Sequence, residues 1–221
     1  MLLDFIQNRE SFDVEDLIFL FIAYGIIILL CLPVHEFAHA LAAHLCGDDT
    51  AKWHGRLTLN PFAHLTLWGT AMLVLCGIGY AKPVPVISRN LHHYKRDMIL
   101  ISLAGPVSNL LMAILAAGIF KVCTLFITDV TVLTYLATVL IGIIMNVNVS
   151  LAVFNLLPIP PLDGSRLWST ILPGKWAYAL EKNSRYITIG LFAVLMLGIL
   201  DGPLAFINNI FRAGIFALFG L

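Results

Sequence analysis

Two histidines spaced four residues apart, with a glutamate directly after the first, are the residues best suited to chemistry in this chain. They form the run His35-Glu36-Phe37-Ala38-His39. Residues four apart lie on one face of a helix, so both imidazoles can hold one Zn²⁺ while Glu36 stands beside it as a general base. Zinc makes water nucleophilic near neutral pH. The pattern therefore predicts a hydrolytic zinc centre.

The surroundings of this pentapeptide are apolar. Between Leu17 and Cys46 the only acidic or basic side chains are those of His35, Glu36, His39 and His44. A charged side chain in a membrane costs roughly 2.5 to 3.5 kcal/mol on insertion scales, so a glutamate kept there indicates a functional role. An interhelical polar contact is the alternative interpretation of the same three residues.

Composition independently predicts a membrane protein. The 221 residues are 60% hydrophobic and only 12% charged, with a mean hydropathy of +0.92. These values are far from those of a soluble domain. The net charge of 0 says nothing about nucleic acid, but the chain has no basic stripe and no phosphate loop, so no nucleic-acid partner is expected. The lipid bilayer is the expected surrounding.

We expect an all-α polytopic protein of about five to six transmembrane or re-entrant helices, with a small membrane-associated β element. One domain covers 1–221, with a catalytic core at about 17–168 and a C-terminal helical hairpin at about 186–221. Apolar segments that are long enough, or nearly so, to span a bilayer are 17–46, 98–127, 132–157, 186–200 and 203–221.

Three further segments between the first two spans have other expected structures. Residues 65–80 are apolar but short and contain Gly69, Gly77 and Gly79. Residues 56–60 and 82–87 alternate polar and apolar side chains, which is typical of short strands. The β element is expected there.

A catalytic zinc ion normally takes three protein ligands, and the pentapeptide supplies two. The chain has no glutamate between Glu36 and Glu181, and Ala42 and Leu45 exclude a metzincin extension. Asp163 is the best remaining carboxylate, because it follows a proline-rich segment that ends the 132–157 helix. Its alternative interpretation is an Asp-Gly turn at the membrane surface.

Three motifs together resemble the site-2 protease family of intramembrane zinc metalloproteases. They are His35-Glu36-x-x-His39, Gly105-Pro106-x-x-Asn109, and Asn155-x-x-Pro158 followed by Leu162-Asp163-Gly164. The segment Lys82-Pro83-Val84-Pro85-Val86 also resembles compact prokaryotic members, without PDZ or CBS modules. Where such members often carry an aspartate, two residues after His64, this chain has Thr66, so His64 is given no catalytic role.

The resemblance implies one zinc ion per chain, held by His35, His39 and Asp163. It implies Glu36 as catalytic base and acid, with Asn155 and Asn109 as polar groups near the reaction centre. Substrates would be transmembrane-helix proteins cut within or near the bilayer, as in regulated intramembrane proteolysis. For both asparagines, an ordinary interhelical amide contact is the alternative.

Basic residues predict the orientation in a prokaryotic cell membrane. Lys and Arg gather before Met98 and after Leu157, so both segments should face the cytoplasm. Asp163 would then lie toward the cytoplasm, which places the histidines at that depth and residues 1–16 outside. The chain must cross an even number of times between Cys46 and Met98, so 65–80 is predicted to be re-entrant.

Two functions from other classes remain as alternatives. A divalent-metal transporter would need polar or acidic residues spread along a path through the bilayer, whereas this chain gathers its polar groups near one depth. An inactive scaffold that binds membrane helices would not need Glu36 and all three expected ligands.

Overall fold

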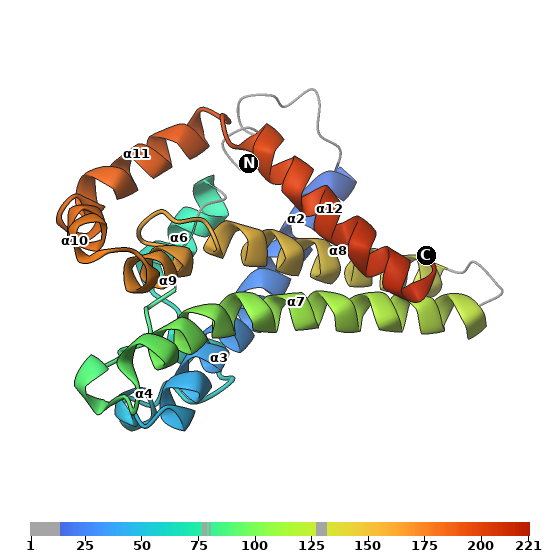
Figure 1. Ribbon diagram of the computed structural model, residues 1–221. Helices are drawn as coiled ribbons and strands as arrows, with labels where there is room; N and C mark the ends of the chain where they lie inside the picture. The colour runs from blue at the N-terminus through green and yellow to red at the C-terminus, as the bar shows by residue number, and fades with distance from the viewer. Residues whose placement is uncertain (1–13, 77–78, 80, 127–131) are drawn as a thin grey trace.

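The computed structural model describes residues 14–76, 79, 81–126 and 132–221. Within these ranges the regular structure is helical and contains no strand. Figure 1 shows long helices packed against one another at the centre, with shorter helices gathered toward the end where α7 begins. The predicted all-helical class is confirmed for the described part of the chain.

The motif-bearing helix is one continuous rod made of α2 (Val14–Ile26), a π-turn η2 (Ile27–Cys31) and α3 (Leu32–Leu45). Pro33 lies at the start of α3 and has no N–H for the preceding turn. The wider π-turn directly before it accommodates the missing hydrogen bond within an otherwise unbroken helix. The segment predicted at 17–46 is therefore helical, with the histidines in its C-terminal half.

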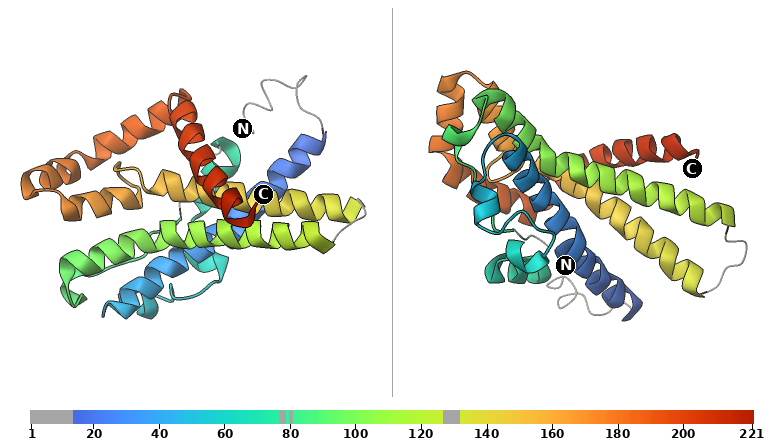
Figure 2. Two further views of the ribbon diagram at one scale, coloured as in Figure 1. Left: turned by 45° about the vertical axis from the view of Figure 1, so that its right-hand side comes forward. Right: turned by 90° about the horizontal axis from the view of Figure 1, so that it is seen from below.

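Three other long helices form the scaffold against which this rod packs: α7 (Tyr94–Phe126), α8 (Val132–Asn155) and α12 (Asp201–Phe219). Figures 1 and 2 show α7 and α8 lying antiparallel, α12 lying on the pair, and the α2–α3 rod crossing it. Small and apolar side chains fill the contact between α7, α8 and α12. Its buried members are Ala113, Ala116, Ala117, Met145, Val149, Val153 and Ile215.

The remaining helices are short and lie in the connections. Those between α3 and α7 are α4 (Thr50–Trp53), α5 (Pro61–His64), α6 (Leu67–Cys76) and the 3₁₀ turn η3 (Ser88–Asn90). Those between α8 and α12 are α9 (Asp163–Ile171), α10 (Gly174–Lys182) and α11 (Ser184–Met196).

Four helices in the described part of the chain are long and apolar enough to span a membrane. They are Phe21–Leu45, Tyr94–Phe126, Thr134–Asn155 and Asp201–Phe219. The predicted span at 186–200 becomes α11, whose 13 residues reach about 20 Å against a hydrocarbon core of about 30 Å. The expected five to six membrane helices are thus not confirmed beyond four.

The segment 65–80 contains α6, a helix of 10 residues that extends about 15 Å, half the thickness of the hydrocarbon core. The backbone N–H of Lys82 donates to the carbonyl of His64 at 2.7 Å, so the two ends of this segment lie next to each other. We call residues 64–82 the excursion. That 65–80 forms a re-entrant element stays a prediction.

The β element expected at 56–60 and 82–87 is not confirmed, because neither segment forms a strand. Ile87 has extended backbone, with φ −103° and ψ 105°. Alternation in the sequence identifies extended backbone, but a sheet also needs a neighbouring chain with which to exchange hydrogen bonds. The N–H of Ile87 instead donates to the Asp48 carboxylate at 2.6 Å.

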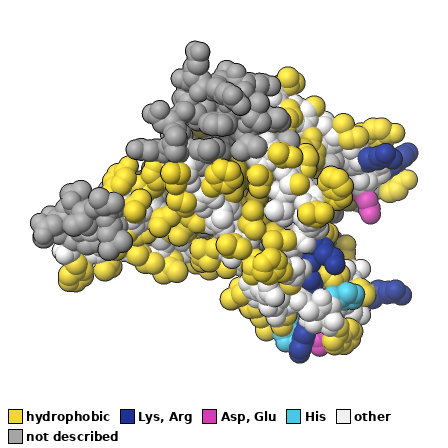
Figure 3. All heavy atoms as spheres, turned by 180° about the vertical axis from the view of Figure 1, so that it is seen from behind, with side chains coloured by type: hydrophobic (Ala, Val, Ile, Leu, Met, Phe, Trp, Pro, Cys, Tyr) yellow, Lys and Arg dark blue, Asp and Glu magenta, His cyan; other side chains and the backbone are white. Residues whose placement is uncertain are grey.

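Charged side chains are confined to one end of the visible surface. In Figure 3 the Lys, Arg and His side chains gather at the right-hand end, which carries α4 and α10, while hydrophobic side chains cover most of the rest. A wide apolar surface next to a charged end is typical of a protein embedded in a bilayer with one end at the interface. The predicted location of 1–16 falls largely outside the described residues.

Candidate metal centre

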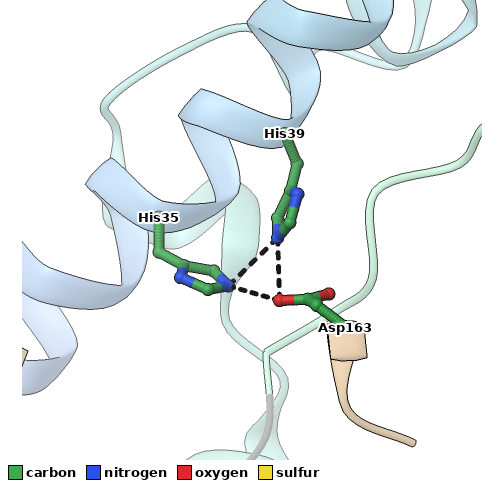
Figure 4. Close-up of side chains that lie close together, drawn as sticks. All are labelled: His35, His39 and Asp163. Atoms are coloured by element: carbon green, nitrogen blue, oxygen red, sulfur yellow. Dashed lines mark hydrogen bonds and ion pairs between the residues drawn. The ribbon is translucent and has the colours of Figure 1, made fainter. Parts of the chain in front are cut away.

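Three possible ligand atoms converge where α3 meets the start of α9. His35 Nε2 and His39 Nε2 lie 3.1 Å apart. Asp163 Oδ2 is 3.1 Å from the first and 3.0 Å from the second, as Figure 4 shows. Both histidines are buried, and Asp163 is partly buried. The structure therefore brings together the three side chains that the sequence proposed as ligands.

The backbone fixes which nitrogen of His39 is free to bind a metal. His39 Nδ1 lies 2.7 Å from the carbonyl oxygen of Ile101. A carbonyl can only accept, so Nδ1 carries the proton and Nε2 of the neutral ring carries a lone pair. That lone pair faces the carboxylate oxygen of Asp163 and the Nε2 of His35, an arrangement that calls for a cation or a shared proton.

The donor set fits zinc. Ligand atoms in a tetrahedral zinc centre lie about 3.3 Å apart when each is about 2.0 to 2.1 Å from the ion. The three separations here, 3.0, 3.1 and 3.1 Å, are close to that value. Two imidazoles and one carboxylate leave a fourth position open, which is typical of a catalytic zinc site rather than a structural one.

One face of α7 shapes the site from the other side. Ile101, Gly105 and Asn109 follow one another at four-residue intervals, so they lie on the same face. The Ile101 carbonyl accepts a hydrogen bond from His39 Nδ1–H, and the Asn109 amide lies 3.1 Å from His35 Nδ1. α7 therefore orients both imidazoles through contacts to the nitrogens that point away from Asp163.

The Asn109 amide is oriented by its hydrogen-bond partners. Its side chain is fully buried, and its carbonyl oxygen has no hydrogen-bond partner as placed. Turning the amide by 180° lets that oxygen accept from His35 Nδ1–H, which leaves Nε2 free for a metal. Asn109 therefore contacts a ligand, and we treat it as a residue that orients His35.

Gly105 lies directly against the ligand nitrogens. A Cβ atom at this position would fall 2.3 Å from His39 Nε2 and 2.6 Å from His35 Nε2. No side chain other than hydrogen fits there, so the glycine lets α7 approach α3 and keeps open the space in which a metal would lie. The requirement comes from this close approach rather than from an unusual φ.

Asp163 reaches the histidines because the chain folds back at the end of α8. A Cβ on the next residue, Gly164, would lie 2.3 Å from the Leu157 carbonyl oxygen and 2.4 Å from that of Leu156. The Asp163 carboxylate thereby faces the Nε2 atoms of both histidines and is available to a cation.

Glu36, the expected base, is buried on the helix that carries the two histidines. Its Oε2 lies 3.8 Å from a terminal nitrogen of Arg56, an ion-pair distance too long for a hydrogen bond. Burial lowers the pKa of the Arg56 guanidinium, and the Glu36 charge partly opposes that shift. The carboxylate thus has a cationic neighbour but keeps its lone pairs available.

Two other residues singled out in the sequence have hydrogen-bond partners outside this cluster. The Asn155 side chain donates to the carbonyl of Leu151, one turn earlier in α8, at 2.9 Å. Its expected catalytic role stays a prediction. His64 is fully buried, and its Nε2 is 2.8 Å from the Thr58 carbonyl.

Sequence reasoning missed Arg56 and the contact made by Gly105. Arg56 was placed in an expected strand, and its local sequence gives no sign that its side chain would be buried. Gly105 lies four residues before Asn109 and four after Ile101. This spacing is the signal in the sequence that could have identified the face of α7 that contacts the histidines.

Comparison with known proteins agrees with this geometry. The model of peptidase family M50 matches residues 124–199, a range that contains Asp163 but not the histidine pair. A protein of Bacillus subtilis (strain 168) named "Putative zinc metalloprotease YwhC" is 40% identical over 151 residues, which are 67% of this chain and 68% of that protein.

Two mycobacterial proteins named "Putative zinc metalloprotease Rip2" also match. That of Mycolicibacterium smegmatis is 33% identical over 151 residues, 66% of this chain and 55% of its own length. That of Mycobacterium tuberculosis (strain H37Rv) is 28% identical over 189 residues, 84% of this chain and 70% of its own length. No solved structure matches the chain significantly. Together with the first relative, which is matched over two thirds of both chains, these findings show that the chain belongs to peptidase family M50, the site-2 protease family.

Proposed function

We propose that this protein is an intramembrane zinc metalloendopeptidase, which hydrolyses peptide bonds within or next to the transmembrane helices of other proteins in regulated intramembrane proteolysis. One observation carries the proposal. His35 and His39, which cluster with Asp163, lie on a helix whose residues 21–45 are long and apolar enough to span a membrane.

In the proposed reaction the ligand residues and Glu36 have different roles. His35, His39 and Asp163 would hold one zinc ion per chain, which when bound supplies a Lewis acid that polarises the scissile carbonyl and acidifies water. Glu36 takes a proton from the attacking water and delivers it to the nitrogen of the departing amine. The C–N bond breaks, a carboxylic acid and an amine form, and Glu36 returns to its starting state.

A substrate helix hides its peptide groups in its own hydrogen bonds, so the cleaved stretch must be extended before it can react. The Lys82–Ile87 segment has no strand partner in the described structure, and Ile87 is extended. An extended substrate segment can pair with such a chain by adding a strand to it. The segment is therefore the proposed docking edge for the unwound part of the substrate.

Substitution of Glu36 by glutamine tests the activity. The Glu36→Gln protein should keep its zinc and its melting temperature but lose about 100- to 10,000-fold in cleavage, because only the proton acceptor is removed. Cleavage is measured on a tagged single-span membrane protein co-reconstituted in vesicles, with zinc determined in the same samples. A chelator should abolish wild-type cleavage, and zinc should restore it.

The same samples separate the alternatives. A scaffold would hold the substrate without cutting it in wild-type protein, and a transporter would carry a divalent ion into sealed vesicles. Glu36→Gln protein that cuts at the wild-type rate would refute the proposed role of Glu36.

We further propose that the metal centre faces the cytoplasmic side of a prokaryotic cell membrane, with the N-terminus outside. Single cysteines in place of Asp49 and Arg89, in a cysteine-free protein, test this. Both should react with a membrane-impermeant maleimide from the cytoplasmic side only. Reaction of the two positions from opposite sides would refute both the orientation and the re-entrant excursion.

A further inference from the structure

Arg56 is the one arginine of the described chain that lies almost entirely inside the molecule, with 2% of its surface exposed. It is in the connection between α4 and α5, directly after Gly55, whose φ of +66° reverses the chain. Its own N–H donates to the Ala51 carbonyl at 2.9 Å. The backbone therefore holds Arg56 in a tight turn, and the side chain extends inward.

The guanidinium contacts both ends of the excursion. One terminal nitrogen donates to the Ala63 carbonyl at 2.9 Å, next to the point where the excursion begins. The other donates to the Lys82 carbonyl, where the excursion ends and the proposed docking edge starts. Arg56 thus secures the junction that the hydrogen bond from Lys82 to His64 closes.

The same terminal nitrogen that contacts Lys82 lies 3.8 Å from Glu36 Oε2. A third N–H of the guanidinium, on Nε, is buried without a hydrogen-bond partner. The side chain therefore donates to the carbonyl groups of Ala63 and Lys82, and its charge faces the carboxylate of Glu36, the proposed base. A displacement of the Lys82 carbonyl must move the group that faces Glu36, because the guanidinium is rigid and planar.

We propose that Arg56 is a positioning residue that couples the seating of the Lys82–Ile87 segment to the placement of the Glu36 carboxylate, so that the base is correctly placed when the docking edge is in position. The proposal rests on the proposed peptidase function. It assigns Arg56 no direct contact with substrate. Its charge and its planar pair of donors are both required, and neither glutamine nor lysine supplies both.

Substitutions at Arg56 test this coupling, with Arg89→Gln as the matched control because Arg89 is exposed and lies just beyond the same segment. Arg56→Gln should lower kcat by about 100-fold, the order expected when a catalytic group is misplaced by about 1 Å, while zinc content stays at the wild-type level. Arg56→Lys keeps the charge but not the paired donors, and should fall between wild type and Arg56→Gln.

Chemical rescue distinguishes positioning from a general role in folding. Millimolar guanidinium ion added to Arg56→Ala should restore part of kcat, since the free ion can occupy the vacated cavity, and it should not change Arg89→Gln. Rescue together with retained zinc supports the proposal. An Arg56→Gln kcat within twofold of the control would overturn it, as would zinc loss that parallels the loss of activity.

A measurement without substrate separates this inference from the proposed function. Ala81→Cys, in a protein without other cysteines and carrying Glu36→Gln, reports how firmly the chain is held next to Lys82. Adding Arg56→Gln should increase its maleimide labelling rate severalfold, whereas Arg89→Gln should not. An unchanged rate would refute the coupling, even if wild-type cleavage is established. Failure of wild-type protein to cleave would refute only the function.

Discussion

Polar contacts between long helices serve different ends in two regions of the molecule. Where α7 meets α3, Ile101 and Asn109 contact the outer nitrogens of His39 and His35. Where α12 meets α8, Arg212 donates to Asn146 at 2.9 Å and Asn208 to Ser150 at 3.1 Å. The first set is buried and directed at the candidate ligands, whereas the second is exposed.

The difference shows that a polar group within membrane helices does not by itself mark a reaction centre. Arg212, in a candidate span, carries a charge as unusual there as that of Glu36, yet it donates to the amide oxygens of Asn146 and Asn209. What distinguishes the α3–α7 contact is convergence: each polar group there contacts one nitrogen of an imidazole whose other nitrogen faces a shared point. Substitutions in the two contacts should therefore have unequal effects.

Asp163→Ala should have the largest effect. It removes one of three proposed ligands, so zinc occupancy and cleavage should both be lost, by more than the roughly 10- to 100-fold cost of removing an outer partner. The control is Asp201→Ala in the first turn of α12. Full zinc and full turnover in Asp163→Ala protein would require a different third ligand.

Gly105→Ala should come next. The new methyl group would lie within 2.6 Å of both Nε2 atoms, and such overpacking costs about 1 to 3 kcal/mol, which should appear as weaker zinc binding in a competition titration with a chelator. Gly142→Ala in α8 is the matched control, because nothing lies within 4 Å of a Cβ there. Equal zinc affinities for the two variants would contradict the close approach.

Asn109→Ala should weaken zinc binding or activity by about 10- to 100-fold, because His35 loses the group that orients its ring. Asn208→Ala also removes an interhelical amide, at the α12–α8 contact, and should leave both unchanged. The comparison is made by metal titration and cleavage on the same preparations. A similar loss in both variants would mean that Asn109 acts through helix packing alone.

Arg212→Leu should have the smallest effect on function. Interhelical hydrogen bonds in membrane proteins contribute about 0.6 kcal/mol on average, so the melting temperature should move by little and cleavage should not change. Thermal unfolding in detergent and the cleavage assay measure both. A loss of cleavage with an unchanged melting temperature would show that α12 takes part in function. The α8–α12 contact would then no longer differ from the α3–α7 contact in this respect.

The parts of the molecule that the sequence predicted correctly depend on patterns among residues close together in the chain. Hydropathy located the four long helices, and four-residue spacing put His35 and His39 on one face. Asp163 followed from elimination and from the family resemblance. The predicted β element is not confirmed, because the alternation of polar and apolar residues gives no information about a partner strand. Arg56 and the packing of Gly105 were missed because both depend on contacts between segments distant in the chain.

The junction at the ends of the excursion has a consequence for protein engineering. The hydrogen bonds of Lys82 to His64, and of Arg56 to Ala63 and Lys82, close residues 64–82 into a loop at its base. The length of chain beyond such a closed base is thermodynamically inexpensive to change, since doubling a loop costs only about 0.6 kcal/mol. α6 is therefore a replaceable module, suited to grafting a reporter or a new recognition helix beside an undisturbed metal centre.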